Sequence, residues 1–322
     1  MIVKKRTIPL TILILEALLR RLPKNHSKRP LMIEELSRRR SGYLGEKSLD
    51  FYLRSLDSKN NLILHDLNLP DGNYNCQIDT LLLTPKFALI IEVKNMTGKL
   101  VFDTDNEQFF QVVDGKEIGY PDPIAQAQRH QAYLKNLFPT LEIDYLIVFT
   151  HPHSILSFTG RNIKIREKVC KSSSFLKKVH MLENKSQALI PQKELRKISR
   201  TLMKMNTPPT NYILEKYGIK KSEISIGLHC PLCFYLPLIR KNRKWFCPDC
   251  QTFFKDAHLL SLQDYFLLFD TKITNEQFRD FAHFISADIA YKMLTSSNLN
   301  HLGTKKGRIY FPDSLPLMDN NQ

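Results

Sequence analysis

Two alternating apolar segments, separated by a short turn, most strongly constrain the fold of this chain. Residues 75–83 and 87–94 have the period-two pattern of strands, and Thr84-Pro85-Lys86 lies between them. A hairpin centred on this turn places Asp79 directly opposite Glu92, whether its loop has two residues or four. Because Pro85 fits poorly in a tight two-residue turn, we expect the longer loop. The hairpin therefore predicts two carboxylates that face each other across neighbouring strands.

The same face of the hairpin carries a lysine. Lys94 lies two residues beyond Glu92, and side chains two apart in a strand project to the same side. Opposed carboxylates repel each other unless a cation lies between them, and an oxygen-lined site suits Mg²⁺ or Mn²⁺. Such an ion lowers the pKa of a bound water, while Lys94 can orient that water or stabilise the transition state. The alternative is a salt-bridged cluster on an exposed sheet face.

The elements around this hairpin predict an α/β core. Asp122-Pro123 is a typical helix start, with Asp as N-cap and Pro at the first helical position. Further helices are expected at residues 7–21, 30–39, 43–56 and 174–204, and further strands at 99–102, 109–113 and 143–149.

Residues 40–155 resemble a known family. Gly45-Glu46, the Asp79 strand, the stretch from Glu92 to Asn95 and the stretch from Asp122 to Gln126 follow the order and context of the nuclease-related domain, NERD. That domain is grouped with the PD-(D/E)XK, restriction-endonuclease-like superfamily. Ile78 departs from the superfamily motif, which has Pro before the Asp, but this position varies widely.

The resemblance implies a metal-dependent phosphodiesterase core and assigns its functional positions. Glu46 would supply a further carboxylate, directly or through water, and Gln126 would face the site from the following helix. Gln126 could equally be a helix-capping or surface residue. The catalytic residues implied in this way are Glu46, Asp79, Glu92, Lys94 and Gln126, and the Mg²⁺ or Mn²⁺ ligands are Asp79 and Glu92.

Four cysteines form the pattern C-x₂-C-x₁₃-C-x₂-C, namely Cys230, Cys233, Cys247 and Cys250. Two such pairs, joined by a basic, turn-rich segment, suit a tetrahedral structural zinc ion. Disulfides and redox-active pairs are the alternatives. The segment resembles a zinc ribbon of the topoisomerase-associated type, which suggests contacts with nucleic acid by Arg243 and Lys244. Trp245 either joins those contacts or packs over the zinc site.

The C-terminal part resembles a DNA-binding arrangement of two helices and a basic wing. Helical patterns cover residues 275–286 and 287–297, and a basic stretch that looks like a hairpin follows at 303–310. The candidate phosphate contacts are Tyr291, Lys292, Lys305, Lys306 and Arg308.

The charge distribution favours a polyanionic partner. The chain of 322 residues has a net charge of +15, and its acidic middle part, residues 41–159, lies between strongly basic residues 1–40 and 160–204. Carboxylates that hold a cation, flanked by basic segments that hold phosphates, suit an enzyme acting on nucleic acid. DNA is the expected partner, and the sequence does not distinguish it from RNA. Solvated basic faces are the alternative interpretation.

A membrane protein is not expected. The longest apolar stretch, Ile8 to Leu19, is shorter than a bilayer requires, contains Glu16 and lacks a cleavage site for a signal peptidase. We therefore expect a cytoplasmic protein. The chain also has no G-x-x-x-x-G-K-[ST] motif, so motor activity would need a partner.

These observations together predict an α/β, restriction-endonuclease-like core with a mixed sheet flanked by helices, a small zinc ribbon and a helical C-terminal module. The predicted function is metal-dependent hydrolysis of DNA. The alternative is a non-catalytic protein that binds DNA or joins a DNA-processing complex. The expected segments are 1–40 (basic, helical), 41–155 (nuclease-like core), 156–206 (basic, helical), 207–226 (linker), 227–256 (zinc ribbon) and 257–322 (C-terminal module).

Overall fold

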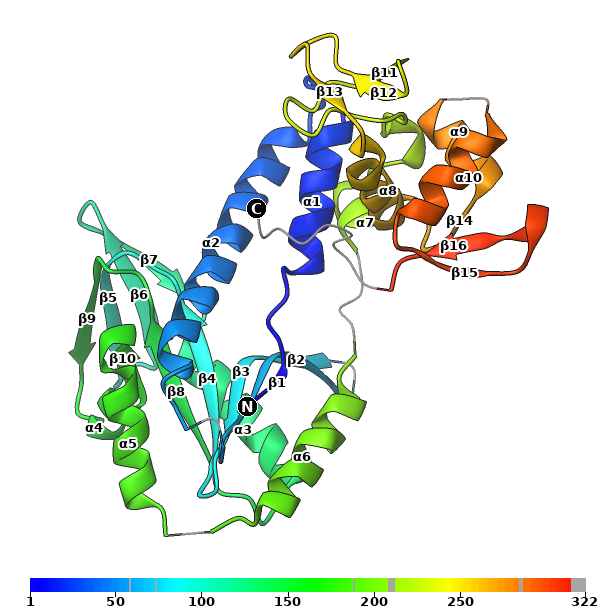
Figure 1. Ribbon diagram of the computed structural model, residues 1–322. Helices are drawn as coiled ribbons and strands as arrows, with labels where there is room; N and C mark the ends of the chain where they lie inside the picture. Colours follow the sequence, from blue (N-terminus) through cyan, green and yellow to red (C-terminus); the bar gives the residue numbers. More distant parts are fainter. Residues whose placement is uncertain (58, 73, 188, 208–211, 284–285, 314–322) are drawn as a thin grey trace. The chain divides into compact units, whose positions relative to one another are not determined.

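The computed structural model describes residues 1–57, 59–72, 74–187, 189–207, 212–283 and 286–313. The chain forms two compact units. Unit 1 comprises Met1–Ile8 and Arg38–Thr210, and unit 2 comprises Pro9–Ser37 and Asn211–Gln322. Figure 1 shows their elements. The six segments expected from the sequence stay a prediction.

A six-stranded mixed sheet forms the centre of unit 1. The strands β2, β3 and β4 are antiparallel neighbours, whereas β8 runs parallel to β4, β10 parallel to β8, and β1 parallel to β2. Their order in the sheet is β1 (Ile2–Lys4), β2 (Leu62–Asp71), β3 (Tyr74–Leu83), β4 (Ala88–Lys94), β8 (Ile143–Phe149) and β10 (Val169–Lys171).

Helices cover both faces of this sheet. Alternate residues of β4 point to opposite sides, so Ile90 belongs to one apolar cluster and Ile91 to the other. The Ile90 side packs against α3 (Pro123–Leu137) and α6 (Gln192–Met205), and the Ile91 side against α2 (Arg29–Leu53) and α5 (Phe175–Lys185). The expected α/β class, with a mixed sheet flanked by helices, is confirmed.

A second, four-stranded sheet completes unit 1. Its strands follow the order β7 (Lys116–Tyr120), β6 (Gln108–Val113), β5 (Gly98–Asp103) and β9 (Ser154–Thr159), with β9 parallel to β5. A short helix, α4 (Ile163–Lys168), precedes β10.

Several elements differ from the sequence expectations. The strands β2 and β7 were not predicted, because neither has a clean apolar alternation. The helices expected at 30–39 and 43–56 form the single helix α2, which continues through Gly42. A glycine inside a helix costs only about 1 kcal/mol, which packing of the flanking residues offsets. Conversely, the basic segment expected to be helical over 174–204 divides into α5 and α6.

Unit 2 contains the four cysteines and the C-terminal helices around one apolar core. The core contains Trp245 from the ribbon together with Leu262, Phe278 and Leu294 from three helices. Its elements are α1 (Leu10–Arg21), α7 (Ile213–Tyr217), β11 (Ile239–Lys241), β12 (Lys244–Phe246), β13 (Phe253–Phe254), α8 (Ala257–Leu268), β14 (Ile273–Thr274), α9 (Asn275–Ala282), α10 (Ala287–Ser296), β15 (Asn300–Leu302) and β16 (Ile309–Phe311). Because Trp245 is only 3% exposed, it packs inside the unit and offers no surface to nucleic acid.

A buried ion cluster ties α1 to the rest of unit 2. Asp264, on α8, is fully buried and accepts hydrogen bonds from Arg20 (2.6 Å) and Arg21 (2.8 Å). His229 Nε2 lies 3.0 Å from the same carboxylate. Although α1 is apolar, no helix in the described part of the chain is long and apolar enough to cross a bilayer.

Candidate active site

The β3–β4 hairpin has the register that the sequence predicts. Leu83 pairs with Ala88 and Thr80 with Ile91, so four residues, Thr84–Phe87, form the loop. The N–H of Thr84 donates to the carbonyl of Phe87 at 2.9 Å and closes the loop. The longer loop is therefore confirmed.

The ladder ends just before the two carboxylates. Its last pair is Thr80 with Ile91, and the next position along would pair Asp79 with Glu92. Instead, the N–H of Val93 donates to Oδ2 of Asp79 at 2.8 Å. The carboxylate of Asp79 is thereby fixed against the strand that carries Glu92.

Lys94 joins Glu92 to helix α3. Its Nζ donates to Oε1 of Glu92 at 2.8 Å and to Oε1 of Gln126 at 3.1 Å. Glu92 is 2% exposed, whereas the side chain of Lys94 is 26% exposed. Gln126 thus faces the carboxylates from α3, and Lys94 lies between them and solvent.

Glu46 approaches from helix α2 and is held by the N-terminal segment of unit 1. The guanidinium of Arg6 forms an ion pair with Glu46 and a second one with Asp50, at 3.3 Å. It also lies 2.9 Å from Nδ1 of His65 and donates to Oγ1 of Thr80 at 3.0 Å. Arg6 therefore places a positive charge against the carboxyl group of Glu46.

Gly45 allows α2 to approach the end of β4. A Cβ atom at this position would lie 2.5 Å from Cβ of Asn95 and 2.8 Å from Oγ1 of Thr150. The side-chain amide of Asn95 donates to the carbonyl of Ser41 at 2.8 Å and holds the helix there. This close packing positions Glu46, the next residue, beside the hairpin.

The three carboxyl groups have raised pKa values. Burial raises the pKa of Glu46 to about 7, with Arg6 opposing the shift and Glu92 adding to it. Burial and the charges of Glu92 and Glu46 raise the pKa of Asp79. Burial also raises the pKa of Glu92, although Lys94 opposes this shift. Crowded carboxyl groups with raised pKa values are common at sites that bind a cation or transfer protons.

One oxygen of Glu92 is left without a hydrogen-bond partner in the described part of the chain. Oε2 is buried and has no hydrogen-bond partner among the described residues. Nδ1 of His130 lies 4.0 Å from this oxygen, and burial lowers the pKa of His130 to about 4, so this ring is neutral. A divalent cation shared with Asp79 would satisfy the orphaned oxygen, so the donor set fits Mg²⁺ or Mn²⁺. A cluster of three or more His, Cys, Asp or Glu ligand atoms, all within 4.8 Å of one another, occurs in the described residues only at the four cysteines of unit 2. The described carboxylates of unit 1 do not form such a cluster.

The sequence did not indicate Arg6, His65 or His130 as neighbours of the site. His130 follows Gln126 by one helical turn, so the i,i+4 spacing on α3 could have revealed it. Arg6 and His65 gave no such local sign, because the chain brings them to Glu46 only through tertiary folding.

The four cysteines of unit 2 have the geometry of a zinc site. Sγ of Cys230 lies 3.6 Å from Sγ of Cys250, and Sγ of Cys233 lies 3.4 Å from Sγ of Cys247. All four sulfur atoms lie within 4.8 Å of one another. Tetrahedral zinc with bonds of about 2.3 Å separates sulfur atoms by about 3.8 Å, far more than the roughly 2 Å of a disulfide. The hairpin of β11 and β12 joins the two pairs, as expected, and the cluster fits a structural zinc ion.

The predicted nucleic-acid contacts lie at two places in unit 2. Arg243 is exposed in the turn between β11 and β12, and Lys244 is exposed at the start of β12. Lys305 is also exposed, and the guanidinium of Arg308 lies 5.6 Å from the centre of the Tyr291 ring. The side chain of the remaining candidate, Lys306, lies outside the described part of the structure.

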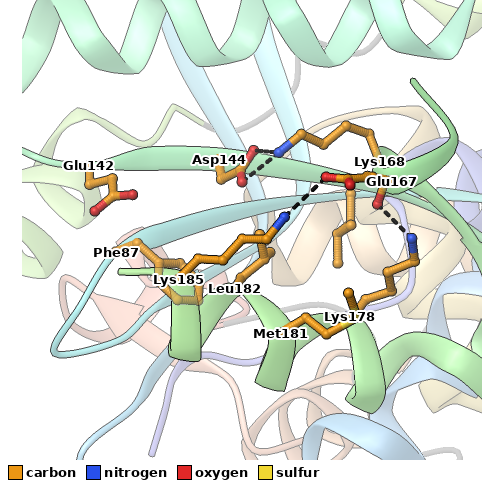
Figure 2. A pocket seen from close by; sticks show the side chains of 10 residues that line it. Phe87, Glu142, Asp144, Glu167, Lys168, Lys178, Met181, Leu182 and Lys185 are labelled. Carbon is orange, nitrogen blue, oxygen red and sulfur yellow. Dashed lines mark hydrogen bonds and ion pairs between the residues drawn. The ribbon is translucent and has the colours of Figure 1, made fainter. Parts of the chain in front are cut away.

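A separate pocket of about 130 Å³ lies at the start of β8 in unit 1, and its lining contains equal numbers of acidic and basic side chains (Figure 2). Lys168 contacts both oxygens of Asp144, and Lys185 lies 3.1 Å from Glu167. The pocket is separate from the candidate active site, because Asp144 in its lining pairs with Leu89 of β4, three positions before Glu92. Its neutral lining does not point to a charged ligand.

Unit 1 is a mixed α/β domain in which two carboxylates and a lysine lie together at the end of the β3–β4 hairpin. Residues 41–150 match the family model described as the nuclease-related domain, NERD. The chain therefore contains a NERD domain, as the resemblance implied. No curated protein matches the chain, and no solved structure matches it.

Proposed function

We propose that unit 1 is a nuclease that hydrolyses phosphodiester bonds of DNA with Mg²⁺ or Mn²⁺. The single observation that carries this proposal is the buried, unpartnered Oε2 of Glu92 beside Asp79, with Lys94 on the same strand. The match of this region to the nuclease-related domain supports it.

Each residue has a definite role in the proposed reaction. Asp79 and Glu92 would hold the divalent cation, which neutralises a phosphoryl oxygen and lowers the pKa of a bound water. Lys94 would donate a hydrogen bond to the attacking water or to the charge that develops on the phosphoryl oxygens. Gln126 fixes the position of the Lys94 ammonium through its 3.1 Å hydrogen bond. Glu46, with its pKa near 7, is suited to accept a proton through an intervening water.

Unit 2 would serve DNA binding. Structural zinc would hold the ribbon, and the exposed Arg243, Lys244 and Lys305 would contact phosphates, with Lys306 and Arg308 nearby. We place the protein in the cytoplasm, where reducing conditions keep such cysteines available for zinc.

The test is cleavage of supercoiled and linear DNA with added Mg²⁺ or Mn²⁺. We expect cutting by the wild-type protein and none by Asp79→Ala or Lys94→Ala. Lys99→Ala is the matched control, because Lys99 is an exposed lysine on β5. All variants should retain zinc and their thermal transition, so that a folding defect is not mistaken for lost chemistry.

A second function, binding without turnover, is supported by the ion pair of Arg6 with Glu46, because it engages the carboxyl group that would otherwise accept a proton. Salt-sensitive DNA binding by a wild-type protein that cuts no DNA would support this function and reject the nuclease. Absence of both cutting and DNA binding would point to a role in a protein complex.

A further inference from the structure

A pocket of about 660 Å³ in unit 2 is lined by residues of the zinc ribbon and of helices α8 and α10. Arg240 and Arg243 come from the ribbon hairpin, Lys255 from the segment before α8, and Lys292 from α10. Among the described residues, no acidic side chain lines the pocket. Four positive charges from three elements therefore surround one concave surface.

These four cations are not neutralised within unit 2. None of them forms an ion pair with a described residue. The guanidinium of Arg240 lies 4.7 Å from the centre of the Trp245 ring, so Arg240 is positioned by an aromatic ring and not by a carboxylate. Like charges at this density repel each other, and an anionic ligand would relieve that repulsion.

His258 provides a second, independent indication of a ligand. This residue lies in the first turn of α8, lines the pocket and is 6% exposed. Both of its ring nitrogens are buried without a hydrogen-bond partner in the described residues. A buried donor left without a partner costs about 1–3 kcal/mol, which a bound acceptor would recover. The N-terminus of α8 lies at the same place, and its N-cap, Asp256, forms no capping hydrogen bond with its side chain.

We propose that this pocket binds the phosphate backbone of a nucleic-acid strand, so that the ribbon and α10 act as one site. This proposal rests on the nucleic-acid binding proposed above and assigns it to particular residues. Four cations along a pocket of this size suit successive phosphates. A free nucleotide fits less well, because among the described residues no Phe, Tyr or Trp side chain lines the pocket to stack on a base.

The test compares two double variants that remove equal charge from unit 2. Lys255→Gln with Lys292→Gln changes the pocket, whereas Lys24→Gln with Lys272→Gln removes two exposed lysines that do not line it. Binding of a fluorescent single-stranded DNA to the full-length, zinc-loaded protein is measured by anisotropy without Mg²⁺ over a range of salt concentrations. The same series with RNA and with duplex DNA shows which strand the pocket takes.

We expect the pocket variant to lose at least about tenfold in affinity and about 1.4 in the slope of log K against log salt, as for two lost phosphate contacts to a single strand. The control variant should change neither quantity by more than a small factor. Equal losses in both variants, or no loss in the pocket variant, would overturn the proposal. So would competition by ATP that abolishes binding at concentrations where equally charged tripolyphosphate does not, since that outcome identifies a nucleotide site.

A further variant probes the buried ring. His258→Phe keeps an aromatic side chain but removes both nitrogens, and we expect weaker binding with unchanged zinc content. If His258→Phe loses zinc, the comparison of the pocket double variant with the control double variant still decides whether the pocket binds the strand. Because binding is measured without Mg²⁺, failure of the nuclease activity does not affect the result.

Discussion

The ammonium of Lys94 lies 2.8 Å from Oε1 of Glu92, two residues away on the same strand. This contact leaves the second oxygen of Glu92 without a partner. One carboxylate thus has one oxygen assigned to a lysine and the other available to a cation. The arrangement connects the proposed metal ligand Glu92 to Lys94, the group that would act on the phosphate.

Loss of Gln126 should weaken catalysis without unfolding the protein. Gln126→Ala removes the 3.1 Å hydrogen bond to Lys94, so the ammonium becomes free to rotate away from the reacting phosphate. We expect kcat for DNA cleavage to fall by about tenfold, equivalent to about 1.4 kcal/mol, with little change in melting temperature. Gln128→Ala is the control, because Gln128 contacts Tyr145 and not Lys94. An equal effect of both changes would contradict a positioning role.

A methyl group at Gly45 should destabilise unit 1. In Gly45→Ala the new Cβ would overlap Asn95 and Thr150, so α2 must shift away from the end of β4. We expect a loss of about 1–3 kcal/mol in the free energy of unfolding, measured in urea. Gly42→Ala is a matched control in the same helix, because no atom lies within 4 Å of its added Cβ. This control should stabilise the helix by about 0.5–1 kcal/mol. Equal effects at both positions would argue against close packing at Gly45.

The stability of the metal-free protein should fall as the pH rises from about 4.5 to 7. Burial raises the pKa of Glu46 to about 7, so the folded state holds this proton more tightly than the unfolded chain, in which the pKa is near 4.5. The stabilisation is fully present below the unfolded pKa and is lost as the pH rises through the folded value. Unfolding in urea at several pH values should show a slope that Glu46→Gln reduces. A slope unchanged by the substitution would assign the titration to another group.

Removal of zinc should affect unit 2 and leave unit 1 folded. Cys230→Ser and Cys247→Ser each remove one of the four clustered ligands, whereas Cys170→Ala, in β10, does not. We expect about one zinc ion per chain in the wild type and in Cys170→Ala, and loss of zinc in the two ligand variants. Elemental analysis together with calorimetry measures this. Zinc retained in both Cys→Ser variants would exclude the four-cysteine site.

Asp264 should be essential for the stability of unit 2. Asp264→Asn leaves the buried guanidinium of Arg21 without its charged partner. Breaking a buried ion pair in this way costs about 3–5 kcal/mol. The melting temperature should therefore fall strongly, while Asp280→Asn, on the exposed side of α9, should change it little. A small effect of Asp264→Asn would show that the cluster is dispensable.

The features that the sequence predicted correctly are local ones. The alternation of residues on either side of Pro85 determines the register of the hairpin, since side chains in strands alternate with a period of two. The N-cap Asp122 begins α3, and its carboxylate accepts the N–H of Ile124. The spacing of the cysteines implies one cluster. In each case the residues that carry the information are neighbours in the chain or joined by one turn.

Only the tertiary structure decided which distant residues complete these sites. Arg6 reaches Glu46 because β1 joins the edge of the central sheet, and α2 continues through Gly42 because both flanking segments are packed. The pocket between the ribbon and α10 also exists only in the folded unit. Burial, ion pairing and concave surfaces depend on contacts between segments far apart in the chain, and no local pattern of residue types encodes them. The sequence by itself therefore determined the hairpin register, the start of α3 and the cysteine pairs, whereas the tertiary structure decided the extent of helices such as α2 and the partners of each site.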